Sequence, residues 1–182
     1  MTTPANTPPA TTGVALPPGA GRRIVGGGLD ATVKVGSDRE PFASTFEVVV
    51  PPGYDVGAHV HHHGEEVFYV LQGRLDVLAF EPVDRSMPDW HEWESADGQR
   101  YLSGGPGAFL HVPPGVPHAF ANTSGATTRV FFQSSVPGGH DNYFDELAEV
   151  LRAGAGHPNP AAVTDLRRRY DIEQLTSLRA PG

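Results

Sequence analysis

The segment from residue 53 to residue 73, GYDVGAHVHHHGEEVFYVLQG, holds the side chains best suited to chemistry. Its His59 and His61 are two residues apart, and side chains two apart project from the same face of a β-strand. Glu66 follows after four further residues, enough chain to bend and return on the next strand. Two imidazoles and one carboxylate are a ligand set for a divalent transition metal such as Fe, Mn, Ni, Co, Cu or Zn. Alone, the segment is equally consistent with a solvated, histidine-rich turn or with an adventitious metal-binding cluster.

A second segment, residues 107–122, reads GAFLHVPPGVPHAFAN and strengthens the metal interpretation. Together the two segments resemble the paired motifs of the cupin superfamily, G-x5-H-x-H-x3,4-E-x6-G and G-x5-P-x-G-x2-H-x3-N. The matching positions are Gly53, His59, His61, Glu66 and Gly73 in the first motif, and Gly107, Pro113, Gly115, His118 and Asn122 in the second. The resemblance covers roughly residues 42–135. It implies one divalent metal bound by His59, His61, Glu66 and His118.

The motif frame also separates these residues from neighbours of the same type. Only Glu66 has the required distance to the closing glycine, so it is favoured over Glu65. His61 and His63 form a second H-x-H pair, but only His59 has the required distance from the opening glycine, so His59 is favoured over His63. His111 lies on a predicted strand but has no motif position. We interpret it as a packing residue or as a neighbour of the metal ligands.

Length and composition exclude several classes of protein. The chain has 182 residues, no cysteine and a formal net charge of −8. Without cysteine there are no disulfides and no thiolate ligands, which excludes zinc-finger-type sites and cysteine nucleophiles. The acidic charge argues against nucleic acid as a partner. Because no apolar run approaches the roughly 20 residues of a membrane span and the N-terminus lacks secretory features, we expect a soluble cytoplasmic protein with no membrane partner.

The composition also predicts the fold class. Twenty-two glycines and eighteen prolines, with few helical periods, indicate short strands joined by tight turns and hence an all-β architecture. The cupin resemblance implies a single jelly-roll β-barrel of two antiparallel sheets with C-terminal helices. We expect a flexible N-terminal segment over residues 1–21, the cupin barrel over 22–140 and a helical extension over 141–182.

Period-two patterns and turn residues predict the strands in more detail. They fall at residues 22–36 (one or two strands), 42–50, 59–63, 67–71, 74–80, 108–112, 118–122 and 129–135. Gln72 and Gly73 predict a hairpin turn, since glycine readily adopts a positive φ. Strand parity makes Phe68, Phe109 and Phe120 candidates for the barrel wall.

The segment 81–106 is an insertion relative to the shortest cupins, and it contains both tryptophans, Trp90 and Trp93. We interpret it as a surface loop anchored against the barrel by its aromatic residues. The alternative is a lid or wall over the barrel mouth that contacts substrate.

Beyond residue 139 the apolar residues recur at helical spacing. Asp141 is a candidate cap for the first helix and Gly154 for its end, and Asn159 is a candidate cap for a second helix. We expect these helices to cover the open side of the barrel or a dimer seam. The arginine run at 167–169 is interpreted as a solvated helix face.

The implied ligand set defines what the site can do. Three neutral imidazoles and one carboxylate leave two positions open on a six-coordinate divalent metal, with a net charge of +1. Such a metal lowers the pKa of an enol or phenol, and Glu66 can also act as a general base.

A narrower resemblance suggests the reaction. The run H-x-H-x4-E-x2-Y-V-L-x-G at 59–73 and the PGG turn at 137–139, which leads into a helix with Tyr and Phe, are similar to bacterial quercetin 2,3-dioxygenases. They imply a dioxygenase that uses O2 on an enolic or phenolic small molecule. The resemblance to single-barrel cupins implies a homodimer. A metal-dependent isomerase, cyclase or lyase and a non-catalytic small-molecule-binding cupin remain the alternatives.

Overall fold

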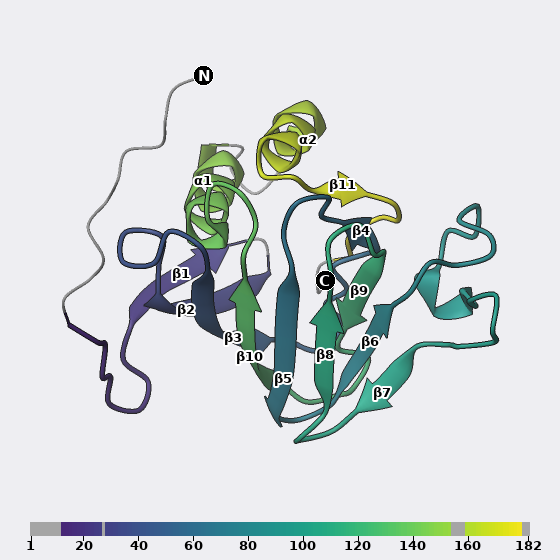
Figure 1. Cartoon of the computed structure of the whole chain (residues 1–182), viewed down its shortest axis with the longest axis horizontal. Coiled ribbons are helices and arrows are strands. Elements are labelled where there is room, and N and C mark those ends of the chain that lie inside the picture. The colour runs from purple at the N-terminus through teal and green to yellow at the C-terminus, as the bar shows by residue number, and fades with distance from the viewer. Residues whose placement is uncertain (1–11, 27, 154–158, 180–182) are drawn as a thin grey trace.

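The computed structural model describes residues 12–26, 28–153 and 159–179. Two antiparallel sheets form the body of the molecule, and two helices pack together at one end of it (Figure 1). The predicted all-β jelly roll with C-terminal helices is therefore confirmed. Within the described ranges, no helix is long and apolar enough to cross a membrane.

The larger sheet has the strand order β1-β2-β3-β10-β5-β8. Its strands are β1 (Arg22–Gly26), β2 (Leu29–Val35), β3 (Ser44–Val50), β5 (Glu66–Gln72), β8 (Phe109–Val112) and β10 (Thr128–Ser134). Alternate residues of β3, β5 and β10 are buried, as expected for a sheet with one face toward a core. Phe132 lies in the middle of this core, with its ring centroid 4.8 Å from that of Phe68 and 5.4 Å from that of Phe46.

The smaller sheet has the strand order β11-β4-β9-β6-β7. Its strands are β4 (His59–Val60), β6 (Leu75–Ala79), β7 (Leu102–Gly104), β9 (His118–Ala121) and β11 (Glu173–Gln174). The short strands β7 and β11 were not predicted from the sequence. β11 pairs with β4, so the segment after the helices adds an edge strand next to the histidine motif.

The hairpin predicted at Gln72 and Gly73 is wrong. Gly73 does have a positive φ of 84°, but β5 belongs to the larger sheet and β6 to the smaller one, so the turn is a corner between sheets. The Thr128 hydroxyl holds this corner, because it accepts from the Arg74 N–H (3.0 Å) and donates to the Arg74 carbonyl (2.7 Å). A local turn pattern does not distinguish the two outcomes.

One predicted wall residue also faces the other way. Phe109 pairs with Tyr69, and both side chains are exposed, at 59% and 42%. Leu110 pairs with Phe68 instead, so Leu110 and Phe68 share the inner face. Nearly every residue of β8 is apolar, so its sequence does not reveal which side faces the core.

The insertion at 81–106 contains the short 3-10 helix η1 (Trp90–Glu92) and packs on the face of the smaller sheet that points away from the core. Trp90 and Trp93 are each 1% exposed, and the Trp90 indole N–H donates to Asp55 (2.8 Å). None of the described residues that line the central cavity comes from this insertion. The structure thus supports the anchored loop and not the lid.

Trp90→Ala is expected to lower the free energy of unfolding by about 3–5 kcal/mol, since it removes a fully buried indole and one of the donors to the Asp55 carboxylate, which keeps the Gly57 N–H. Urea denaturation monitored by circular dichroism measures this loss. Val83→Ala, at a site 73% exposed in the same insertion, is the matched control and should stay within about 0.5 kcal/mol of wild type. Equal stability of the two variants would contradict the anchoring role.

The helices are α1 (His140–Ala153) and α2 (Pro160–Arg169). Asn159 caps α2 as predicted and accepts from the Ala161 N–H at 3.0 Å. The predicted capping role of Asp141 is wrong. It lies inside the first turn, and its carboxylate accepts from the Ser44 hydroxyl (2.6 Å) and the Ser37 N–H (3.1 Å), which ties α1 to the barrel.

Several sequence expectations concern residues outside the described ranges. Gly154, the expected end of the first helix, is one of them, and so is most of the expected flexible segment 1–21. Residues 12–20 contain no strand or helix and are mostly exposed. The division at 21/22 and 140/141 stays a prediction.

Candidate metal centre

The four residues singled out by their spacing come together at one end of the barrel. His59, His61, Glu66 and His118 each offer a ligand atom, and these atoms all lie within 4.8 Å of one another. All four are buried, between 1% and 6% exposed. His59 on β4 pairs directly with His118 on β9 of the smaller sheet, while Glu66 begins β5 of the larger sheet. The cluster therefore joins both sheets, and it fits a single metal site.

Backbone carbonyls orient all three imidazoles. The Nδ1 atoms of His59, His61 and His118 lie 3.0, 2.9 and 3.0 Å from the carbonyl oxygens of residues 57, 171 and 116. A carbonyl can only accept, so Nδ1 carries the proton in the neutral ring and Nε2 keeps its lone pair. Ligand histidines are typically held in this way by a hydrogen bond at the other ring nitrogen.

The remaining ring nitrogens meet the carboxylate. Nε2 of His61 and Nε2 of His118 each lie 3.1 Å from an oxygen of Glu66. Both nitrogens are buried and have no well-oriented hydrogen-bond partner within the described ranges. Buried polar atoms are rarely left in this state. A cation bound between the imidazoles and the carboxylate would satisfy them, so the donor set fits a divalent transition metal.

The charges within the cluster favour a positive centre. Burial acts to raise the pKa of Glu66, but the adjacent imidazoles of His61 and His118 outweigh burial and lower that pKa well below its usual range. Burial acts to lower the pKa of His61, but the negative charge of Glu66 outweighs burial, and the pKa of His61 is raised. Burial and the charges of the other two imidazoles lower the pKa of His59, so this ring is neutral at neutral pH. A metal ion and a proton would compete for this centre.

Asp171 supports the centre although no sequence feature pointed to it. The N–H of Ile172 bonds to the Arg167 carbonyl (2.9 Å), which ends α2 in a Schellman motif with Asp171 at φ 58°. The Asp171 carbonyl is the partner of His61, and its carboxylate accepts from the N–H of His63 (2.7 Å). The end of α2 thus sets the orientation of one imidazole.

The competing residues lie outside the cluster. Glu65 is exposed and pairs with His111, whose Nε2 is 3.2 Å from the Glu65 carboxylate. His111 is therefore neither a packing residue nor a neighbour of the cluster, because it lies on the outer face of β8. The His63 side chain is 72% exposed and pairs with Asp171. The choice of Glu66 over Glu65 agrees with this geometry.

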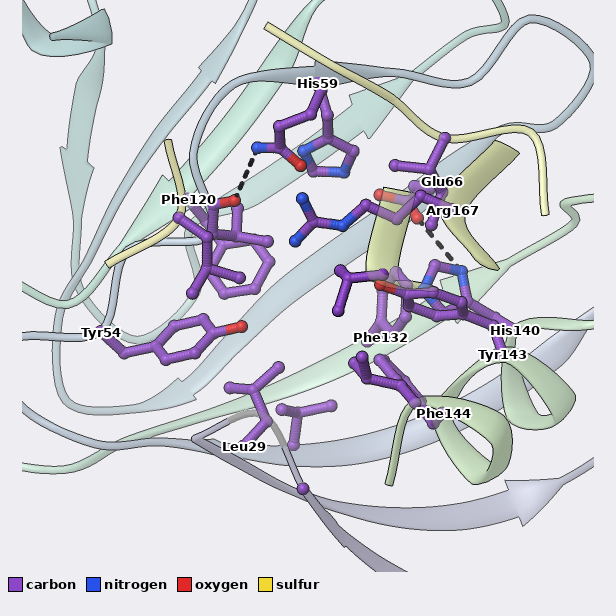
Figure 2. Close-up of a pocket in the computed structure, with 18 of the residues that line it drawn as sticks. Leu29, Tyr54, His59, Glu66, Phe120, Phe132, His140, Tyr143, Phe144 and Arg167 are labelled. Carbon is purple, nitrogen blue, oxygen red and sulfur yellow. Dashed lines mark hydrogen bonds and ion pairs between the residues drawn. The ribbon is translucent and has the colours of Figure 1, made fainter. Parts of the chain in front are cut away.

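A cavity of about 160 Å³ lies beside the cluster, with His59 and Glu66 in its wall. Figure 2 shows the rings of Tyr54, Phe120, Phe132 and Phe144 around this space. Phe68 and Phe120 line it as predicted, whereas Phe109 does not. Both helices and residues 172–178 contribute to the wall. The helices thus cover the open end of the barrel, one of the two positions expected from the sequence.

His140, the first residue of α1, is a site residue that the sequence analysis missed. It is 6% exposed and lines the cavity, with Nδ1 3.0 Å from the Ser134 hydroxyl and 3.5 Å from Glu66 (Figure 2). Burial lowers its pKa to about 4, so the ring is neutral at neutral pH. Its place directly after the PGG turn was the one feature that could have drawn attention to it.

The prediction of a solvated face for residues 167–169 of α2 is wrong for Arg167. Arg168 and Arg169 are exposed and form ion pairs at the surface, in agreement with the prediction. Arg167 is partly buried and lines the cavity instead. Figure 2 shows its guanidinium extending into the space between the aromatic rings.

This chain belongs to the cupin family, since a family model described as Cupin matches residues 39–153. One similar solved structure is a sugar phosphate isomerase from a cupin superfamily of Silicibacter pomeroyi, with TM-score 0.50 and 17% identity over 66% of this chain and 74% of that one. Another is a predicted oxalate decarboxylase from Thermotoga maritima, with TM-score 0.46 and 16% identity over 59% and 79%.

The Schizosaccharomyces pombe Cnp3 cupin domain is also similar, with TM-score 0.44 and 16% identity. That match spans 59% of this chain and 64% of the Cnp3 domain. No curated protein matches the sequence significantly. At these identities the likeness concerns the fold.

Proposed function

We propose that this cupin is a metal-dependent enzyme that binds one divalent transition metal through His59, His61, Glu66 and His118. The observation that carries the proposal is the arrangement of three imidazoles. Each has Nδ1 at a backbone carbonyl, and two have an otherwise unpartnered Nε2 directed at one buried carboxylate. Such preorganisation costs stability unless an ion occupies the centre.

We further propose that the reaction is a dioxygenation of an enolic or phenolic small molecule. A redox-active divalent metal at this centre would supply Lewis acidity and electron transfer to O2. The apolar and aromatic wall supports such a substrate, because it excludes water and accommodates a planar ring. The cavity of about 160 Å³ is smaller than the roughly 300–1,000 Å³ of sites for drug-sized ligands. A single-ring or acyclic substrate therefore fits it better than a three-ring flavonol.

The residues of the chain have separate roles in this proposal. Glu66 is ionised at neutral pH and lines the cavity, so it can take up the enol or phenol proton of the substrate. The neutral His140 contacts Glu66 on the side of α1 and restricts its movement. The expected homodimer stays a prediction.

An oxygen electrode tests the reaction. Protein purified without an affinity tag and loaded with Fe, Mn, Ni, Co or Cu would be supplied with catechols, β-diketones and flavonols. Oxygen uptake that depends on the metal and on substrate supports the dioxygenase. Substrate conversion without oxygen uptake would favour the isomerase, cyclase or lyase alternative, and binding without conversion would favour a non-catalytic cupin.

Removing the metal is expected to lower the melting temperature by about 5–10 °C, because a ligand bound only to the native state stabilises it by about 2.7 kcal/mol at a hundred times Kd. Scanning calorimetry before and after treatment with a chelator measures this shift, and added metal should restore it. An unchanged melting temperature of protein shown to have lost its metal would contradict a metal bound inside the barrel.

A further inference from the structure

Arg167 differs from the other two arginines of its run in lacking an acidic partner. Arg168 pairs with Asp165 at 3.2 Å and Arg169 with Glu146 at 2.7 Å. Across residues 12–26, 28–153 and 159–179, no carboxylate lies within 4 Å of the Arg167 guanidinium. Its side chain lies in the wall of the cavity that also contains His59 and Glu66.

Two phenol groups face the same guanidinium. Tyr54 and Tyr143 line the cavity, and Figure 2 shows their hydroxyls turned toward its interior. Burial raises the pKa of both phenols, and the positive charge of Arg167 acts on both in the opposite direction. One cation and two hydroxyls therefore form a second polar group in the cavity wall, in addition to His59, Glu66 and His140.

The Arg167 guanidinium is partly buried without a carboxylate partner within 4 Å among the described residues, so the solvation that it loses is not compensated by a neighbouring anion. A ligand carboxylate would compensate it well, since the planar fork of arginine donates two parallel hydrogen bonds to a carboxylate. The two hydroxyls would add neutral donors. A phosphate dianion is a poorer match, because Arg167 is the one cationic side chain among the described residues that line this cavity.

We propose that Arg167, with Tyr54 and Tyr143 beside it, binds the carboxylate of the substrate. Together with the proposed function, on which this part rests, the substrate is then a small carboxylic acid with an enol or phenol at its other end. The carboxylate lies at Arg167 and the reacting oxygen faces Glu66. The cavity of about 160 Å³ leaves room for one ring or a short chain between the two groups.

Isothermal titration calorimetry with benzoate, benzamide and phenylphosphate tests the assignment, with the full chain both metal-loaded and chelator-treated. Wild-type protein should bind benzoate more tightly than benzamide by roughly tenfold or more in both states, since charge-assisted hydrogen bonds contribute that much. Arg167→Gln should lose this preference and keep the affinity for benzamide. Arg167→Lys should keep part of it, because it retains the charge without the fork.

Arg168→Gln is the matched control, a solvent-exposed arginine on the same helix, and should bind benzoate like wild type. The assignment would be overturned if Arg167→Gln bound benzoate as tightly as wild type. It would also be overturned if chelator-treated wild-type protein showed no preference for benzoate over benzamide. Tighter binding of phenylphosphate than of benzoate would overturn the choice of a carboxylate.

The outcomes separate this inference from the proposed function. If wild-type protein takes up no metal but its benzoate preference depends on Arg167, the metal enzyme is wrong and the carboxylate site stands. If wild-type protein binds metal but its benzoate affinity does not change in Arg167→Gln, only the carboxylate site is wrong. Circular dichroism of each variant shows whether a change in affinity is caused by misfolding. The comparison of benzoate with benzamide in chelator-treated wild-type protein tests the carboxylate site without any variant.

Discussion

His118→Ala is expected to abolish stoichiometric metal binding, with a loss of affinity of about a hundredfold or more. His118 comes from β9 and meets Glu66 across the two sheets, with Nε2 3.1 Å from the carboxylate. Its Nδ1 is already held by the Val116 carbonyl, so the ring is oriented before any metal arrives. Alanine removes one of the four proposed ligands.

Mass spectrometry of the metal content measures this loss, with protein purified without a histidine tag. His111→Ala is the control, because His111 lies seven residues earlier with its side chain 48% exposed. We expect about one metal ion per chain in wild type and in His111→Ala. Full metal content in His118→Ala would show that the ligand assignment is wrong. Loss of metal in both variants would indicate binding at the surface.

Glu66→Gln is expected to reduce turnover by about 10²–10⁴-fold while the chain still folds. Glutamine keeps the size of the side chain, but a neutral amide cannot accept the substrate proton and is a weaker metal ligand. Glu66 is 2% exposed between His61 and His118, and among the described residues it is the one carboxylate in the cluster. The loss should therefore appear in kcat.

Rates per bound metal, measured with any substrate found in the oxygen-electrode screen, separate the loss of a base from the loss of metal. Glu65→Gln provides the control, since Glu65 is the adjacent residue and faces solvent beside His111. Its rate should equal that of wild type. If Glu66→Gln were as active as Glu65→Gln, Glu66 would be neither the metal ligand nor the general base.

The residues of the proposed metal centre could be named from the sequence because they match the two motifs that resemble those of cupins. Two histidines two residues apart in an extended segment project to the same side, and the motif spacing to Gly73 selects Glu66 over Glu65. Period-two patterns likewise identified the main strands, since alternate residues must face the core. The choice of ligands therefore rests on the motif resemblance, and the pairing of β4 with β9 is what brings His118 beside His59.

Other features depend on contacts between segments far apart in the chain, and only the tertiary structure decided them. Gly73 permits a corner as readily as a hairpin, and the contact of Thr128 with Arg74 selects the corner. The sequence of β8 does not show which of its side chains face the core, and its pairing register with β5 decides this. The packing of the helices over the barrel mouth brought His140 and Arg167 into the cavity. Such positions follow from where whole elements pack, which neither residue type nor spacing specifies.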